Sequence, residues 1–136
     1  QIIMTIIELK KEREAKHTAL FKDCALFWAF SNEQFAEGKA KHPIEEGEKY
    51  VSIGAGGYMP KSNVGKFNSG MKEIQRWFNQ ATKDEKMRKA LIRYELANHE
   101  ATYTGEIEDT LATLGEGYTP EEVQKELNQL YQLEYD

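Results

Sequence analysis

Apolar residues recur at helical spacing through the middle of the chain. One set follows Ser62, which is well placed to cap a helix, and steps of three or four residues connect its members: Val64, Phe67, Met71, Ile74, Trp77 and Phe78. A second set follows the capping pair Thr82 and Glu85, ends near His99 and consists of Met87, Leu91, Tyr94 and Ala97. We therefore predict two consecutive amphipathic helices.

The beginning of the chain predicts one long helix. Thr5 and Glu8 form a capping box, and the residues from there to residue 30 contain no glycine or proline. Residues 10–18 are mostly charged, whereas residues 19–30 are mostly apolar. We expect the second half of this helix to be buried and the first half to project into water or against a partner.

Three other segments carry signals for helix starts. Residues 31–34 form a second capping box, where the first helix either kinks or gives way to a short one ending at Gly38. Residues 104–109 place carboxylates in the first turn of a short helix that Gly115 stops. Residues 119–122 combine an N-cap, a proline and two glutamates. The inward stripe of this last helix begins with Val123, Leu127 and Leu130.

Residues 50–60 predict a strand and a tight turn. Residues 50–53 favour a strand, and residues 54–57 supply three glycines that can reverse its direction before Pro60 ends the pairing. A P-loop would need glycine where Ala55 and Pro60 stand, and a dinucleotide fingerprint would need it at Met59. We therefore interpret the stretch as a structural hairpin and not as an anion site.

Length and composition favour one domain. The chain has 136 residues, of which 40% are hydrophobic, enough for one core and too few for two. We predict a single domain over residues 1–136, mainly α (α+β), with about five helices and one short glycine-rich β-hairpin. The apolar run in residues 1–7 is shorter than a membrane span and lacks a signal-peptide layout. We interpret these residues as a flexible or non-native segment.

Charge is distributed unevenly. The net charge is −5, but residues 61–93 hold nine basic against three acidic residues, and residues 104–136 hold one against nine. One interpretation is that the acidic helices pack beside the basic ones, the remaining charges being solvated. A second is a basic patch for an acidic partner, formed by Lys83, Lys86, Arg88, Lys89 and Arg93. A third is an acidic surface that imitates nucleic-acid phosphates, formed by Glu106, Glu108, Asp109, Glu116, Glu121, Glu122 and Glu126.

No catalytic or metal-binding constellation stands out, so we expect no metal and no cofactor. His99 lacks the second histidine four residues on that a zinc-protease helix needs. Cys24 stands among apolar residues, which raise a thiol pKa, so we interpret it as a core residue. Because a single cysteine excludes an internal disulfide, we expect a cytoplasmic protein. Acid–base chemistry would have to use His99, Glu100 and Tyr103. We favour the interpretation that these residues belong to a hydrogen-bond network that ends a helix.

The sequence resembles small uncharacterised proteins of phages and mobile elements of gut bacteria. The residues that carry the resemblance are 29–35, 50–62, 94–96 with 98–100, 103–105 with 107 and 109, and 118–119 with 121–123. Some proteins of this kind are anti-CRISPR proteins that inhibit Cas9. The resemblance spans most of residues 8–123 and brings no catalytic motif.

The resemblance implies a non-enzymatic inhibitor that binds a Cas9-type nuclease and blocks DNA recognition or cleavage. The acidic final helices, the projecting first helix, or both, would make the contact, and the first helix could also pair copies of the chain. Direct nucleic-acid binding is not expected of an acidic chain without a recognition motif, and neither is membrane association. The alternatives are a phage or mobile-element regulatory protein unrelated to CRISPR, and a small enzyme using the His99 cluster.

Overall fold

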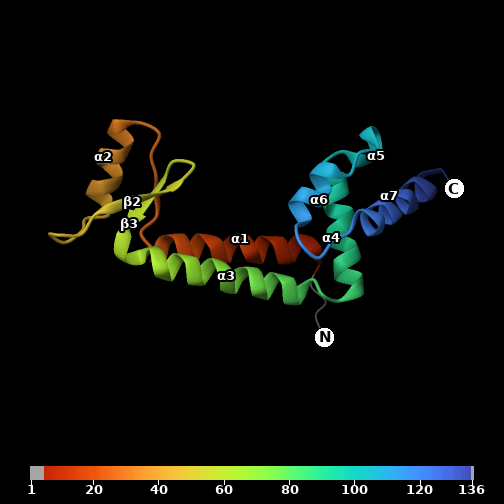
Figure 1. Ribbon diagram of the computed structural model, residues 1–136, viewed down its shortest axis with the longest axis horizontal. Coiled ribbons are helices and arrows are strands. Elements are labelled where there is room, and N and C mark those ends of the chain that lie inside the picture. The colour runs from red at the N-terminus through yellow and green to blue at the C-terminus, as the bar shows by residue number, and fades with distance from the viewer. Residues whose placement is uncertain (1–4, 136) are drawn as a thin grey trace. The chain divides into compact units, whose positions relative to one another are not determined.

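The computed structural model describes residues 5–135, without the side chains of residues 134 and 135. Within these residues the chain is mainly α-helical, with seven α-helices and a three-stranded antiparallel sheet (Figure 1). The predicted fold class is therefore confirmed. Of the leading segment, residues 1–4 lie outside the described residues, and Ile6 and Ile7 begin the first helix.

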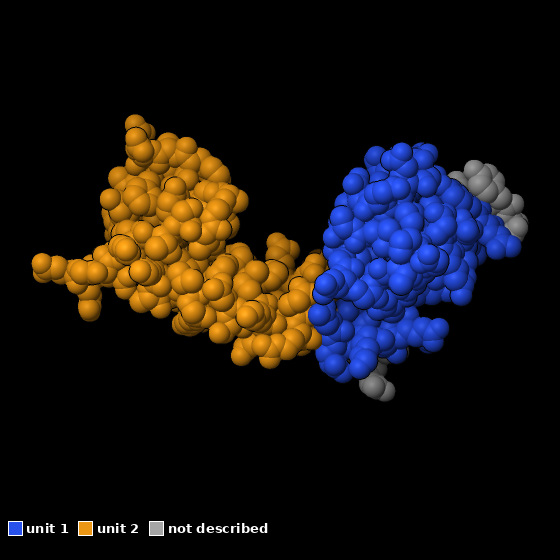
Figure 2. All heavy atoms as spheres, in the orientation of Figure 1, with its two compact units in different colours: residues 1–9, 79–136 blue, residues 10–78 orange. Residues whose placement is uncertain are grey.

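Contacts divide the chain into two compact units (Figure 2). The sheet unit comprises residues 10–78, and the helical unit comprises residues 1–9 and 79–136. Both division points fall inside helices, since α1 is Ile6–Asp23 and α3 is Val64–Ala81. That the chain forms one domain stays a prediction.

Two antiparallel helices, α1 and α3, form one side of the sheet unit (Figure 1). The rings of Phe21 and Phe67 lie 6.0 Å apart, and the Lys16 ammonium lies 4.7 Å from the Trp77 ring centroid. Gly70 lets Leu20 approach closely, because a Cβ at Gly70 would lie 2.4 Å from Leu20 Cδ1. The periodic apolar face predicted for α3 thus packs as expected.

The sheet has the order β1-β3-β2, with β1 at Phe27–Trp28, β2 at Tyr50–Gly54 and β3 at Gly57–Pro60. Strands β2 and β3 form the predicted hairpin, in which Val51 pairs with Met59. Phe27 pairs with Tyr58 across the other side of β3. Gly56 has φ 84° in the turn, a conformation that glycine adopts without strain.

The prediction of one helix reaching residue 30 is wrong. Helix α1 ends at Asp23, Ala25 has φ 56°, and the chain continues into β1. The run that follows Cys24 is rich in aromatic residues, which suit a strand as well as a helix. Pairing with β3 decides between them, and this contact is remote in sequence and invisible to local periodicity.

A short helix, α2 (Asn32–Lys41), lies next to the sheet. The Oγ of Ser31 accepts a hydrogen bond of 3.1 Å from the Gln34 N–H, so the second capping box starts a new helix. The Phe27 ring lies 6.0 Å from the Phe35 ring and directly against Gly38. Other rings complete this aromatic cluster: His42, Tyr50 and Tyr58. A 3₁₀ turn, η1 (Lys61–Asn63), connects β3 to α3.

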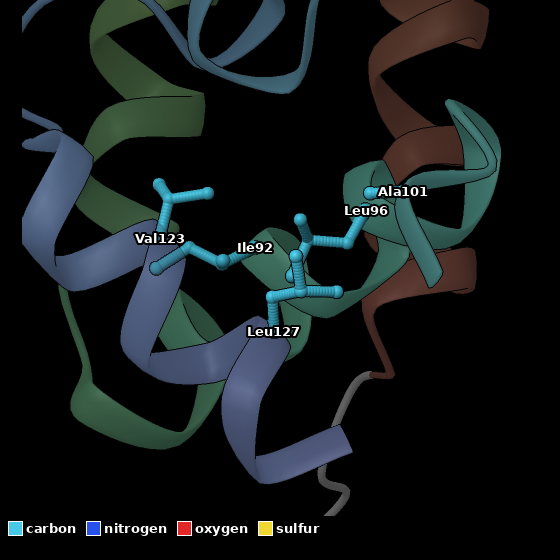
Figure 3. Close-up of a cluster of buried hydrophobic side chains, with 5 residues drawn as sticks. All are labelled: Ile92, Leu96, Ala101, Val123 and Leu127. Atoms are coloured by element: carbon cyan, nitrogen blue, oxygen red, sulfur yellow. The ribbon is translucent and has the colours of Figure 1, made fainter. Parts of the chain in front are cut away.

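The helical unit contains α4 (Glu85–Asn98), α5 (Ala101–Thr104), α6 (Glu108–Leu114) and α7 (Pro120–Tyr135). Buried side chains from α4, α5 and α7 form its core (Figure 3): Ile92, Leu96, Ala101, Val123 and Leu127. As predicted, the Thr119 hydroxyl caps α7 by accepting a hydrogen bond from the Glu122 N–H.

The predicted start of α4 is displaced by two residues. Asp84, and not Thr82, is the N-cap, and its carboxylate accepts a hydrogen bond of 3.2 Å from the Met87 N–H. The Thr82 hydroxyl instead donates to the Asn79 carbonyl and is buried. A carboxylate is the stronger acceptor and also compensates the positive helix end, which explains why the cap forms at Asp84.

Candidate functional site

Two ion pairs join α4 to α7 and use four of the predicted site residues. Arg88 donates from Nε to Glu122 Oε1 at 2.6 Å and from Nη2 to Glu122 Oε2 at 2.8 Å. Arg93 Nε donates to Glu126 Oε1 at 2.9 Å and its Nη2 to Gln129 Oε1 at 3.0 Å. For these residues, the interpretation that acidic helices pack beside basic ones is therefore confirmed.

The Arg88 pair is held from several directions. The guanidinium also donates to the Gly117 carbonyl and stacks 4.0 Å above the Tyr118 ring. The hydrogen bond with Arg88 lowers the pKa of Glu122, and the same bond raises the pKa of Arg88. Both partners therefore stay charged at neutral pH, and the pair fixes the chain segment that leads into α7.

Replacing Glu122 by glutamine should lower stability above pH 4.5, the ordinary pKa of its carboxyl group. Because the folded-state pKa is lowered, the carboxylate stabilises the fold above that pH and loses its effect as pH falls through the folded value. We expect the variant to lose up to about 1 kcal/mol at pH 7, as for partly exposed ion pairs. Urea unfolding at pH 7 and pH 3 measures this difference, and an equal loss at both would contradict it.

The other predicted charged residues are exposed and make no ion pair with the described side chains. Five are acidic: Glu106, Glu108, Asp109, Glu116 and Glu121. Three are basic: Lys83, Lys86 and Lys89. The acidic set lies in the loops and first turns around α6 and α7, whereas the basic set lies at the start of α4. The helical unit thus exposes more unpaired negative than positive charge from the predicted set.

Three of these carboxylates gather around one hollow of about 240 Å³, lined by His99, Thr104, Glu106, Glu108 and Asp109. Gly105, with φ 72°, ends α5 and turns the chain, and the Thr104 hydroxyl accepts a hydrogen bond of 3.1 Å from the Glu106 N–H. Glu108 and Asp109 then occupy the first turn of α6, where the helix dipole favours carboxylates. Local chain geometry therefore brings the acidic groups together.

His99 ends α4 and contacts residues other than those predicted. Its Nε2 lies 2.9 Å from Thr113 Oγ1 and 3.7 Å from Oε2 of the buried Glu95. Tyr103 is 90% exposed, and no hydrogen bond joins it or Glu100 to His99 in the described part of the chain. The structure thus does not assemble the cluster considered for an enzyme. The i,i+4 spacing of Glu95 and His99 on one helix was the available signal for the observed contact.

One family comparison covers most of the chain. Residues 9–133 match a family of unknown function, DUF7659. The chain belongs to that family. No curated protein and no solved structure matches it. The match contains every residue of the hollow and of both ion pairs of the DUF7659 chain, so these features lie within the matched residues.

The described residues of the DUF7659 chain also bear on metal binding, on membrane-spanning helices and on the role of the single cysteine. They contain no group of three or more His, Cys, Asp or Glu side chains placed to hold a metal ion. Among the described residues, no helix combines the length and the apolar composition of a membrane-spanning segment. Cys24 is fully buried, and burial raises the pKa of its thiol, as the sequence predicted. Its position fits a core residue.

Proposed function

We propose that this DUF7659 chain is a non-enzymatic binding protein whose acidic hollow docks onto a basic, nucleic-acid-binding surface of a partner. The partner we propose is a Cas9-type nuclease in the cytoplasm of a bacterial host, which makes the chain an anti-CRISPR-type inhibitor. The observation that supports this is the gathering of three exposed carboxylates, Glu106, Glu108 and Asp109, without ion-pair partners among the described residues.

Electrostatics favour such a contact. A Cas9-type nuclease holds its guide–target duplex in a positively charged channel through backbone contacts. Carboxylates on a folded surface can occupy such a channel in place of phosphates, because complementary potentials speed encounter and fix orientation. The choice of this nuclease rests on the resemblance described above, whereas the choice of a basic surface rests on the charges of the hollow.

Reversing the charge of the three carboxylates at the hollow tests the proposal. The variant Glu106→Lys, Glu108→Lys, Asp109→Lys should bind the nuclease at least about tenfold more weakly than the wild type, since close charge pairs across interfaces contribute more than 1 kcal/mol each. Biolayer interferometry against immobilised nuclease measures the dissociation constant, and a DNA cleavage assay measures inhibition. Thermal unfolding by circular dichroism establishes that the variant is folded.

A matched control lies in the sheet unit. Glu37, Glu45 and Glu46 are exposed, and replacing all three by lysine changes the net charge by the same amount. We expect this control to retain most of the wild-type affinity. An equal loss in both variants would mean that net charge alone governs binding and would contradict a role for the hollow. A pull-down from host lysate that retrieves a different basic protein would instead support the regulatory alternative.

A further inference from the structure

Two aromatic side chains stay exposed beside the glycine turn of the sheet unit. Trp28 is 50% exposed and Phe30 is 76% exposed. Both rings rest on glycine backbone, since a Cβ at Gly56 would lie 2.3 Å from Phe30 Cε1, and one at Gly57 would lie 3.0 Å from Trp28 Cζ3. Each ring therefore lies against the backbone of the turn with one part and is open to solvent with the rest. With Ile53, which also lies against Gly57, these residues form the hairpin patch.

The hairpin patch comes from chain segments without charge. Residues 24–32 and residues 50–60 contain no Asp, Glu, Lys or Arg, although such residues make up 30% of the chain. An exposed apolar group of this kind favours contact with another apolar surface, because burial removes aromatic area from water.

We propose that the hairpin patch binds the same patch on a second copy of the chain. In a two-fold symmetric contact each patch faces itself, so any net charge in it would meet like charge. The chain carries a net charge of −5, so two copies repel each other at long range, and a patch without charged residues adds no like-charge repulsion where they meet. Strand β1 is also an edge of the sheet, which leaves Trp28 at a border that a copy can reach.

Aromatic pairs provide the attraction in this contact. Trp28 and Phe30 of one copy would lie against the same rings of the other, in the offset or edge-to-face arrangements that aromatic rings prefer. The patch has few side chains compared with a standard interface of about 800 Å² per partner, so we expect a weak dimer that forms at micromolar or higher concentration. The contact is independent of the acidic hollow, and its failure would leave the proposed function untouched.

Sedimentation velocity of the full chain over a concentration series tests the dimer. The wild type should shift from monomer to dimer as concentration rises, and Phe30→Ser should raise the dimer dissociation constant at least tenfold. Phe30 is mostly solvent-exposed, so this variant should keep its fold. The control is Tyr103→Ser, which removes another ring exposed to 90% and should leave the dissociation constant unchanged.

Three results would overturn the proposal. The first is a wild type that stays monomeric up to millimolar concentration. The second is a dimer that Phe30→Ser leaves intact, which would favour pairing through α1. The third is a monomer that co-sediments with neutral phosphatidylcholine vesicles and loses this binding in Phe30→Ser, which would assign the patch to a lipid surface.

Discussion

Truncating Leu127 to alanine is expected to destabilise the helical unit by about 2–5 kcal/mol, the range for removing a buried leucine. Leu127 is fully buried on α7 and packs in one cluster with Ile92 and Leu96 of α4 (Figure 3). A total stability of about 5–15 kcal/mol is usual, so this loss is a large share of it. Urea unfolding followed by far-ultraviolet circular dichroism measures the effect.

The matched control for this variant is Leu133→Ala. Leu133 lies on the same helix but is 67% exposed, so its truncation should cost less than about 0.5 kcal/mol. Equal losses in the two variants would contradict the buried core described for α4 and α7.

The same experiment tests the single-domain prediction. Both tryptophans, Trp28 and Trp77, lie in the sheet unit, so their fluorescence reports unfolding of that unit, whereas Leu127 lies in the helical unit. If the chain is one cooperative domain, Leu127→Ala shifts the fluorescence midpoint as much as the circular dichroism midpoint. A fluorescence midpoint that does not move would show two independent domains.

Replacing Gly38 by alanine is expected to destabilise the sheet unit by about 1–3 kcal/mol, the usual cost of overpacking. A Cβ at Gly38 would lie 2.1 Å from Cδ2 of Phe27, whose buried ring is confined by Phe35 and Tyr50. The ring cannot move away without disturbing these contacts, so the strain exceeds the helix propensity of about 1 kcal/mol that alanine adds. Tryptophan-detected urea unfolding measures the change.

A second glycine provides a control of opposite sign. Gly65 lies in helix α3, and a Cβ there would meet nothing within 4 Å. Gly65→Ala should therefore stabilise the chain by up to about 1 kcal/mol, because alanine restricts the unfolded chain and favours the helix. If Gly38→Ala also stabilised the chain, the packing of α2 against Phe27 would have to be wrong.

Helices with strong periodicity could be predicted from the sequence, as could the hairpin. The stripe from Val64 to Phe78 and the start at Thr119 required only local rules of spacing and capping. Strand β1 could not be predicted in this way, because Phe27 and Trp28 become a strand by pairing with Tyr58 and Gly57, about thirty residues later. Tertiary pairing overrode the local preference for helix.

The charge imbalance of the candidate site was visible in the sequence, but its division into paired and exposed groups was not. Glu122 and Glu126 form ion pairs with Arg88 and Arg93, because the packing of α7 on α4 brings these side chains within hydrogen-bond distance. Glu108 could not be distinguished from them by residue type or spacing. Only the turn at Gly105 and the direction of α6 place it at the hollow.

Competition with nucleic acid is the most direct test of the proposed function. The chain is titrated against a guide-loaded Cas9-type nuclease with and without matched target DNA, and the dissociation constant is measured in each case. If the acidic hollow occupies the nucleic-acid groove, target DNA should weaken binding at least tenfold, and rising salt should weaken it as well. Equal dissociation constants with and without target DNA would contradict the proposal that the acidic hollow occupies the nucleic-acid groove.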